Sequence, residues 1–404
     1  MTDQFVIVGA GLAGAKAAET LRAEGFSAPI TLVGMEGERP YERPPLSKGI
    51  LIGKEPRDKA FVHTPEWYAE HDVTLLPETS AVRLDTAGHT VELSDGQTLG
   101  YTKLLLATGA SPRLLEVPGA ERASYLRTLG DSERLLEQFT DGAHVVIIGG
   151  GWIGLEAAAA ARAHGCHVTV VEVTVLPLQR VLGAEVARVF MELHQANGVE
   201  FRCSSSVREL TGSSVVLNDG TELPADVVIA GLGVWPNVEL AAEAGLSVHN
   251  GVVTDAGMRT SDPDVYACGD VASSYHPLMG KWIRVEHWAN ALNGGPVAAK
   301  SMLGQDVVYD RLPYFFSDQF DLGMEYAGYV EPGGYDRVVF RGDPGTGEYV
   351  AFWLTEGRVL AGMNVNVWDV QDDIQKLVRA GFAGQAVDPD RLADASIPVS
   401  DSLV

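Results

Sequence analysis

Short apolar runs, several of them followed by a glycine turn or an alanine-rich stretch, recur through the first part of the chain. Such runs are typical of strands buried in a parallel sheet, and the alanine-rich stretches favour packed helices. Runs of this kind before residue 112 are FVIVG, ITLVG, VTLL and KLLLATG, and those within 113–243 are HVVIIG, HVTVVE, VEFR and DVVIAG. The pattern predicts an α/β fold with two doubly wound, Rossmann-like nucleotide-binding domains.

The pattern changes near residue 313. Residues 244–312 return to glycine-rich loops and end in the helix-like stretch HWANALNGGPVAAKSML. After them, DRVVFRG and YVAFWLTEGRVLAGMNV alternate as strands do, and VQDDIQKLVRAG has the spacing of an amphipathic helix. We therefore expect residues 313–404 to form a separate C-terminal α+β domain.

One phosphate-binding fingerprint occurs twice, each time after the first apolar run of a predicted domain. The Gly-x-Gly-x-x-Gly pattern consists of Gly9, Gly11 and Gly14 in one copy and of Gly149, Gly151 and Gly154 in the other. The first glycine allows a tight turn, the second lets the backbone approach a pyrophosphate, and the third lets the helix pack on the strand. Free N–H groups at the start of the helix then hold the phosphates.

An acidic residue after the next apolar run strengthens both matches. Glu36 and Glu172 stand about 20 residues beyond their glycines, where a carboxylate accepts hydrogen bonds from a ribose diol. The chain is therefore expected to bind two dinucleotides, and two such ligands on one chain indicate a hydride relay between them.

Composition excludes several classes of partner and site. The chain has 404 residues and a net charge of −24, which disfavours nucleic acid and anionic membranes. No apolar stretch reaches the ~18 residues of a membrane helix, and no secretory signal is evident, so we expect a cytoplasmic protein. The cysteines Cys166, Cys203 and Cys268 are scattered, so neither a dithiol relay nor a metal site is predicted.

Further motifs follow one another in a distinctive order along nearly the whole chain. They are YERPPLSK (41–48), LLLATGAS (104–111), GLGVWPN (231–237), VYACGDVAS (265–273), EHWANALNGG (286–295) and PYFFSDQFD (313–321). With the doubled fingerprint, this order resembles the NADH-dependent ferredoxin reductases of the glutathione-reductase-like flavoprotein superfamily, which serve haem-thiolate monooxygenases or Rieske oxygenases. The resemblance implies an FAD-binding domain in two parts, 1–112 and 244–312, an NADH-binding domain at 113–243 and the C-terminal domain at 313–404.

The resemblance also assigns residues to the two cofactors. Those implied for FAD are Gly9, Gly11, Gly14, Glu36, Arg43, Lys48, Ala107, Thr108, Gly109, Asp270, Trp288 and Phe316. Those implied for NADH are Gly149, Gly151, Gly154, Glu156, Glu172, Arg180 and Gly233. For Trp288 and Phe316, core packing is an equally good interpretation, and relatives often carry tryptophan where Phe316 stands.

Two of these residues are the catalytic candidates. The resemblance pairs Lys48 with Glu156, and a cation beside the flavin N5 stabilises negative charge there. The hypothesis is an ion pair at that atom; the alternative is a surface lysine and a glutamate on the surface of a helix.

Glu172 predicts a preference for NADH, because its carboxylate suits a free 2′-hydroxyl and repels a 2′-phosphate. Residues 173–176 contain no arginine, whereas Arg180 either holds such a phosphate or contacts the pyrophosphate.

The electron acceptor is expected to receive electrons directly from the flavin. Ser47 stands near the place where related peroxidases have a redox cysteine, so a cysteine relay is not expected. The resemblance implies a [2Fe–2S] ferredoxin as partner. Alternative electron acceptors are rubredoxin, monodehydroascorbate and a quinone. An alternative function for the whole protein is that of a slow NADH-sensing flavoprotein resembling apoptosis-inducing factor. A monomer or weak homodimer is expected. Cations that could form a docking patch, or be scattered solvated charges, are Lys281, Arg284, Lys300, Arg311 and Arg337.

Overall fold

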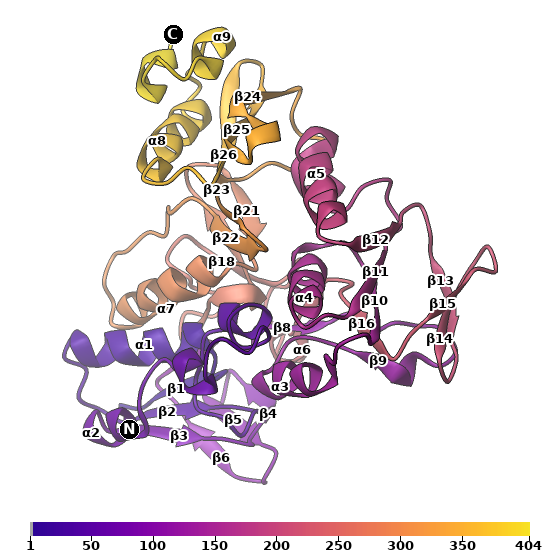
Figure 1. Ribbon diagram of the computed structural model, residues 1–404. Coiled ribbons are helices and arrows are strands. Elements are labelled where there is room, and N and C mark those ends of the chain that lie inside the picture. Colours follow the sequence, from indigo (N-terminus) through magenta and orange to yellow (C-terminus); the bar gives the residue numbers. More distant parts are fainter. Residues whose placement is uncertain (1–2) are drawn as a thin grey trace. The chain divides into compact units, whose positions relative to one another are not determined.

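The computed structural model describes residues 3–404 and confirms the predicted fold class, with two parallel sheets and a C-terminal antiparallel sheet (Figure 1). The chain divides into two compact units. The first contains the residues up to Glu42, Ala60–Ser111 and Val234–Pro313, and the second contains Arg43–Lys59, Pro112–Gly233 and Tyr314–Val404. The finer division into domains at residues 112, 243 and 312 stays a prediction.

A parallel sheet of five strands forms the centre of the first unit. In spatial order its strands are β19 (Val265–Ala267), β7 (Lys103–Leu106), β1 (Phe5–Val8), β2 (Ile30–Val33) and β3 (Val73–Leu76). Every residue of β1 and β2 is buried, as expected for a parallel sheet that is covered on both faces. Phe5 and Ile7 face one side of the sheet, and Val6 and Val8 face the other.

Each face of this sheet has its own covering layer. Helices α1 (Leu12–Ala23) and α7 (Trp288–Met302) pack through small alanines on the face of Ile7. The opposite face packs against the antiparallel strands β4 (Ala81–Asp85), β5 (Thr90–Leu93) and β6 (Thr98–Gly100). The other elements of this unit are α2 (Pro65–Glu70), β8 (Ala110–Pro112), β17 (Val234–Pro236), α6 (Glu239–Glu243), β18 (Val252–Thr254), β20 (Ala272–His276) and β21 (Lys281–Arg284).

The second unit repeats the parallel design and adds the antiparallel sheet. Its parallel sheet has the order β12 (Val199–Arg202), β11 (His167–Val171), β10 (His144–Ile148), β16 (Val227–Ala230) and β9 (Ala123–Ser124). One face packs on α3 (Leu129–Gln138) and α4 (Trp152–Ala163), and the other on the small sheet β13 (Val207–Leu210), β14 (Ser214–Leu217) and β15 (Glu222–Pro224).

The C-terminal sheet is fully antiparallel. Its order is β22 (Tyr314–Gln319), β23 (Leu322–Gly328), β26 (Arg358–Val365), β25 (Glu348–Thr355) and β24 (Arg337–Asp343). Two helices follow the strands, α8 (Gln371–Phe382) and α9 (Pro389–Ala393). Helix α5 (Gln179–Ala196) shares a hydrophobic core with this sheet, in which Trp353 is among the largest fully buried side chains. None of the helices within residues 3–404 combines the length and apolar character that a membrane span requires.

Candidate functional site

The first glycine loop has the shape that a pyrophosphate site requires. Gly9 has a φ of +121°, and a Cβ there would lie 2.0 Å from the Ala107 carbonyl oxygen. A Cβ on Gly14 would lie 2.1 Å from the Gly9 carbonyl oxygen, whereas a Cβ on Gly11 would meet no atom within 4 Å. Two glycines are thus needed for close packing, and the middle one faces open space where a phosphate group fits against the backbone.

The second loop repeats this geometry in the other unit. A Cβ on Gly149 would lie 2.4 Å from the Gly231 carbonyl oxygen, and one on Gly154 would lie 2.1 Å from that of Gly149. Gly151 again has open space around its Cβ position. Both loops precede a helix of twelve residues, α1 or α4, whose first N–H groups are available to an anion.

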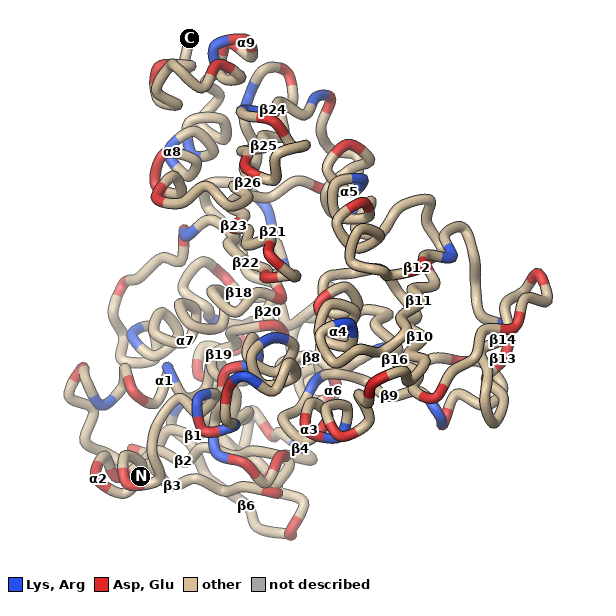
Figure 2. The backbone as a smooth tube through the Cα atoms, viewed as in Figure 1, with Lys and Arg blue, Asp and Glu red and all other residues tan. Residues whose placement is uncertain are grey.

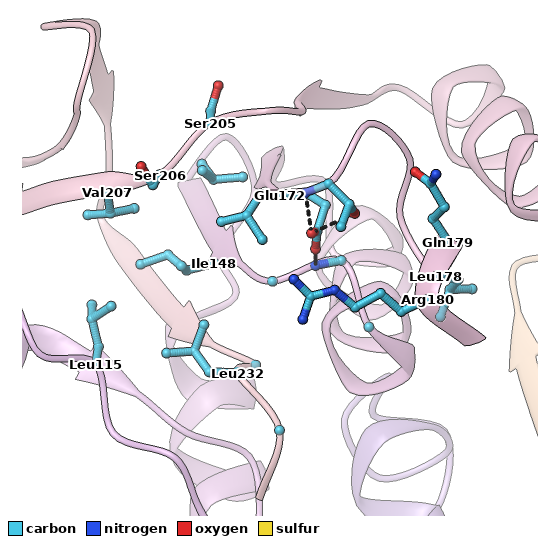
Figure 3. Close-up of a pocket in the computed structure, with 18 of the residues that line it drawn as sticks. Leu115, Ile148, Glu172, Leu178, Gln179, Arg180, Ser205, Ser206, Val207 and Leu232 are labelled. Atoms are coloured by element: carbon cyan, nitrogen blue, oxygen red, sulfur yellow. Dashed lines mark hydrogen bonds between the residues drawn. The ribbon is translucent and has the colours of Figure 1, made fainter. Parts of the chain in front are cut away.

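A pocket of about 420 Å³ opens over the second loop. Its lining brings together five of the residues predicted to bind NADH: Gly149, Gly151, Glu172, Arg180 and Gly233. Figure 3 shows apolar side chains, among them those of Leu115 and Leu232, on one side of the pocket, with Glu172 and Arg180 on the other. Among the described residues, the lining does not include Gly154, which packs beneath the loop, or Glu156.

Glu172 is held in place by the loop that it is predicted to complete. The Gly150 N–H donates to its Oε2 at 2.7 Å, and the Thr174 N–H donates to its Oε1 at 2.8 Å. These bonds orient the carboxylate at the end of β11, where the sequence pattern predicts the contact with ribose. Arg180 lies at the start of α5 on the same side of the pocket as Glu172.

The predicted ion pair between Lys48 and Glu156 is present in the second unit. Lys48 follows a short turn, Pro44–Ser47, and its Nζ lies 2.9 Å from Oε1 of Glu156 on α4. The side chains are 16% and 4% exposed, so the alternative of a surface lysine and a surface glutamate is wrong. The lysine Nζ also lies 5.3 Å from the centre of the Phe316 ring on β22.

A chain of hydrogen bonds continues from Glu156 into the core. Ser47 Oγ donates to Oε2 of Glu156, and Ser317 Oγ donates to its Oε1 at 2.7 Å. Gln319 Nε2 donates to Ser317 Oγ at 3.0 Å, and the Gln319 Oε1 lies 2.8 Å from His194 Nε2. Each hydrogen bond in this chain can have its donor on the side away from Glu156. The Glu156 carboxylate therefore accepts hydrogen bonds from both Ser47 and Ser317.

His194 ends this chain in its neutral form. Burial lowers the pKa of the imidazole to about 4, although the bond to Gln319 opposes the shift. Because the Gln319 carbonyl oxygen is an acceptor, the single ring proton is on Nε2. The other nitrogen, Nδ1, is buried without a hydrogen-bond partner within the described part of the chain.

Most of the other residues that are predicted to bind FAD lie in the first unit, where several form hydrogen bonds with neighbouring residues. Tyr41 donates its hydroxyl proton to Glu36, and Trp288 Nε1 donates to Glu42 Oε2 at 3.1 Å. Thr108 Oγ1 donates to the Asn237 carbonyl at 2.8 Å, which fixes the turn between Ala107 and Gly109. Asp270 lies in the short turn Gly269–Val271. Arg43, in the second unit, donates to the Arg127 carbonyl.

The cations proposed as a docking patch are partly neutralised. Arg284 lies 2.5 Å from Glu286, and Lys300 lies 3.3 Å from Glu24. Figure 2 shows basic and acidic positions interspersed along the chain. The charge pattern therefore gives no support to a docking patch for an acidic partner, which stays a prediction.

The cysteines do not have the environment of a redox thiolate. Burial raises the pKa of the Cys268 thiol to about 12, and it also raises the pKa of Cys166 and of Cys203. All three are free thiols. Within residues 3–404, no group of three or more side chains of His, Cys, Asp or Glu comes together in a way that could hold a metal ion.

Comparison with known proteins gives one consistent family. Residues 3–295 match the family model of pyridine nucleotide-disulphide oxidoreductases, and residues 314–403 match a reductase C-terminal domain. The anthranilate 1,2-dioxygenase system ferredoxin–NAD(+) reductase component of Burkholderia cepacia is 41% identical, with 99% of both chains covered. The rubredoxin–NAD(+) reductase of Ectopseudomonas oleovorans is 35% identical over 90% of this chain and 96% of that protein.

Solved structures agree with the sequence comparison. Putidaredoxin reductase, solved in a covalent complex with putidaredoxin, superposes with a TM-score of 0.93 at 38% identity and covers 99% of this chain and 97% of that one. The putidaredoxin reductase of Pseudomonas putida is 38% identical in the sequence comparison, which covers 99% of this chain and 97% of that enzyme.

Proposed function

Because the chain belongs to the pyridine nucleotide-disulphide oxidoreductase family, and within it to the ferredoxin–NAD(+) reductases of oxygenase systems, we propose that it is an FAD-dependent NADH:ferredoxin oxidoreductase. Its partner would be a [2Fe–2S] ferredoxin that serves a haem-thiolate monooxygenase or a Rieske oxygenase. When bound, FAD accepts a hydride from NADH and releases the two electrons one at a time to such a carrier.

The doubled glycine loop is the observation that carries this proposal. Each unit has one loop whose middle glycine faces open space, so the chain offers two separate places for a pyrophosphate. The loop beneath the pocket, with Glu172 at its edge, suits NADH, and the loop of the first unit then remains for FAD.

The chain's own contribution to hydride transfer centres on Lys48. Its ammonium group would stabilise negative charge on a reduced flavin, and Glu156 would hold this ammonium in position. Ser47 and Ser317 hold the carboxylate in turn, so that the lysine does not depend on a single flexible contact.

The cysteines support a direct exit of electrons. No described thiol has an environment that favours the thiolate, and Ser47 occupies the turn beside Lys48. A one-electron carrier then takes electrons without a cysteine intermediate.

The test is an anaerobic stopped-flow mixture of the FAD-loaded protein with NADH, followed by a [2Fe–2S] ferredoxin. The flavin absorbance should bleach rapidly and then return as the ferredoxin is reduced. Rapid bleaching without transfer to any ferredoxin would contradict the ferredoxin assignment. Slow bleaching with a persistent charge-transfer band would instead favour an NADH-sensing flavoprotein.

A second candidate acceptor is rubredoxin. The rubredoxin–NAD(+) reductase of Ectopseudomonas oleovorans matches 90% of this chain at 35% identity, so rubredoxin is a direct alternative to ferredoxin. Parallel assays with equal concentrations of a rubredoxin and a ferredoxin separate the two by their values of kcat/KM.

A further inference from the structure

Helix α5 is broken near its start, at the point where it leaves the nucleotide pocket. Gly183 has a φ of 79° and a ψ of 172°, which are not helical values. The residues before this break, Leu178, Gln179, Arg180 and Val181, all line the pocket. Arg180 therefore lies on a short turn before the break. The part of α5 that follows Gly183 does not by itself fix the position of Arg180.

This turn is tied at its beginning to the glycine loop. The Leu178 N–H donates to the Gly150 carbonyl at 2.9 Å, and Leu178 itself has a φ of 58°. The side chains of Leu178 and Leu182 are buried in the core shared with the C-terminal sheet, whereas Arg180 is exposed at the pocket.

The end of the turn is tied to the C-terminal sheet. Trp353, on β25, donates its indole proton to the Leu182 carbonyl at 2.9 Å. The break at Gly183 interrupts the regular bonding of the helix, and the indole satisfies a carbonyl at that break. A Cβ on Gly183 would lie 1.8 Å from the Tyr335 hydroxyl oxygen, so another residue there would have to displace this side chain and adopt a strained positive φ.

We propose that the C-terminal sheet positions the Arg180 turn for the dinucleotide, with Trp353 as the positioning residue. The inference rests on the proposed binding of NADH in this pocket. It gives the sheet a role in nucleotide affinity, exerted from the core through the Leu182 carbonyl, although Trp353 is not itself one of the residues that line the pocket.

The test is calorimetric titration of the FAD-loaded protein with NAD⁺. W353F keeps an aromatic ring but removes the donor, and the Kd is expected to rise about 2- to 10-fold, as for the loss of one hydrogen bond. Y349F is the matched control, because Tyr349 is on the same strand and in the same core, and its hydroxyl has no partner among the described residues. The limiting rate of flavin reduction at saturating NADH should stay unchanged in W353F.

A double-mutant cycle with R180A tests the route. If Trp353 acts through the Arg180 turn, W353F should have little further effect on the Kd in the R180A background. Equal effects in both backgrounds, or an unchanged Kd in W353F, would overturn the proposal. If the wild-type protein does not bind NAD⁺ at all, the proposed function itself is wrong. Should W353F fail to fold, G183A alters the same break from the helix side and should raise the Kd; an unchanged value would again refute the role.

Discussion

The Nζ atom of Lys48 lies 2.9 Å from Oε1 of Glu156, and both groups are largely withdrawn from solvent. Removing one partner of such a pair leaves the other charge buried without compensation, which costs about 3–5 kcal/mol. Replacing Glu156 with glutamine should therefore disturb the position of the Lys48 ammonium, to which we assign a role at the flavin.

If Lys48 acts at the flavin as we propose, Glu156→Gln should slow NADH-dependent bleaching of the flavin at least about 10-fold, because the ammonium loses the carboxylate that orients it. Stopped-flow absorbance measures this rate directly. Glu133→Gln is the control. Glu133 pairs with Arg57 at 3.2 Å in the same unit, but the two side chains are 39% and 42% exposed. Equal rates in wild type and Glu156→Gln would remove the assigned role of the pair.

Ser317 donates to the same carboxylate, so its hydroxyl should contribute to stability. A hydrogen bond to a charged group is worth about 1.5–3 kcal/mol, and Ser317→Ala should lower the free energy of unfolding by this amount in urea titrations. In the control variant Ser301→Ala, the lost hydroxyl is equally buried but has no partner in the described part of the chain. A Ser317→Ala protein as stable as that control would argue against the network.

The nucleotide preference should depend on Glu172. Its carboxylate is oriented by the N–H groups of Gly150 and Thr174, so it presents a fixed negative charge beside the pocket. Glu172→Ser should reduce the ratio of kcat/KM for NADH to that for NADPH about 10- to 100-fold, equivalent to about 1.4–2.7 kcal/mol. Glu200→Ser, at an exposed position on β12, should leave the ratio unchanged. A wild-type enzyme that uses both nucleotides equally well would already contradict the assignment.

Acidification should destabilise the protein through His194. Burial lowers its pKa to about 4 in the folded state, whereas a histidine in the unfolded chain titrates near 6.5. Between these values only the unfolded chain binds the proton, so the free energy of unfolding falls as the pH drops, by up to about 1.4 kcal/mol per unit.

Urea titrations at pH 7.5 and pH 5.0 check this expectation. His194→Gln keeps a side-chain donor but does not titrate, so its loss of stability between the two pH values should be smaller than that of wild type. His144→Gln, which removes a largely exposed histidine, should retain the wild-type loss. An identical acid response in all three proteins would show that His194 does not contribute.

The repeated strand, glycine loop and helix could be predicted because local pattern determines them. Val145–Ile148 and Phe5–Val8 are buried on both faces, and the glycines after them need conformations or contacts that other residues cannot adopt. The C-terminal strands were also evident from their alternation. The domain limits and the cofactor roles of individual residues stay predictions.

The remainder of the site could not be read from the sequence because it depends on contacts between distant segments. The motif PYFFSDQFD contains Ser317 and Gln319, but nothing local shows that a serine faces Glu156, so the sequence indicates only Phe316 as a site residue. His194 gave still less signal, because a histidine on the inner stripe of an amphipathic helix looks like any packed residue. Trp353 likewise reads as a core aromatic until its indole partner on α5 is known.

The order of strands in the first sheet has a consequence for synthesis on the ribosome. β1, β2, β3 and β7 have all been made by residue 106, but the edge beside β7 is filled by β19, Val265–Ala267. Leu104 on β7 therefore cannot pair with its partner Val265 until that residue has been synthesised. Until then, this edge of β7 is exposed to other polypeptides. The parallel sheet of the second unit ends at Ala230 and is complete in the nascent chain before the first sheet can close. Slow translation of residues 107–264 would lengthen the time in which this edge can aggregate.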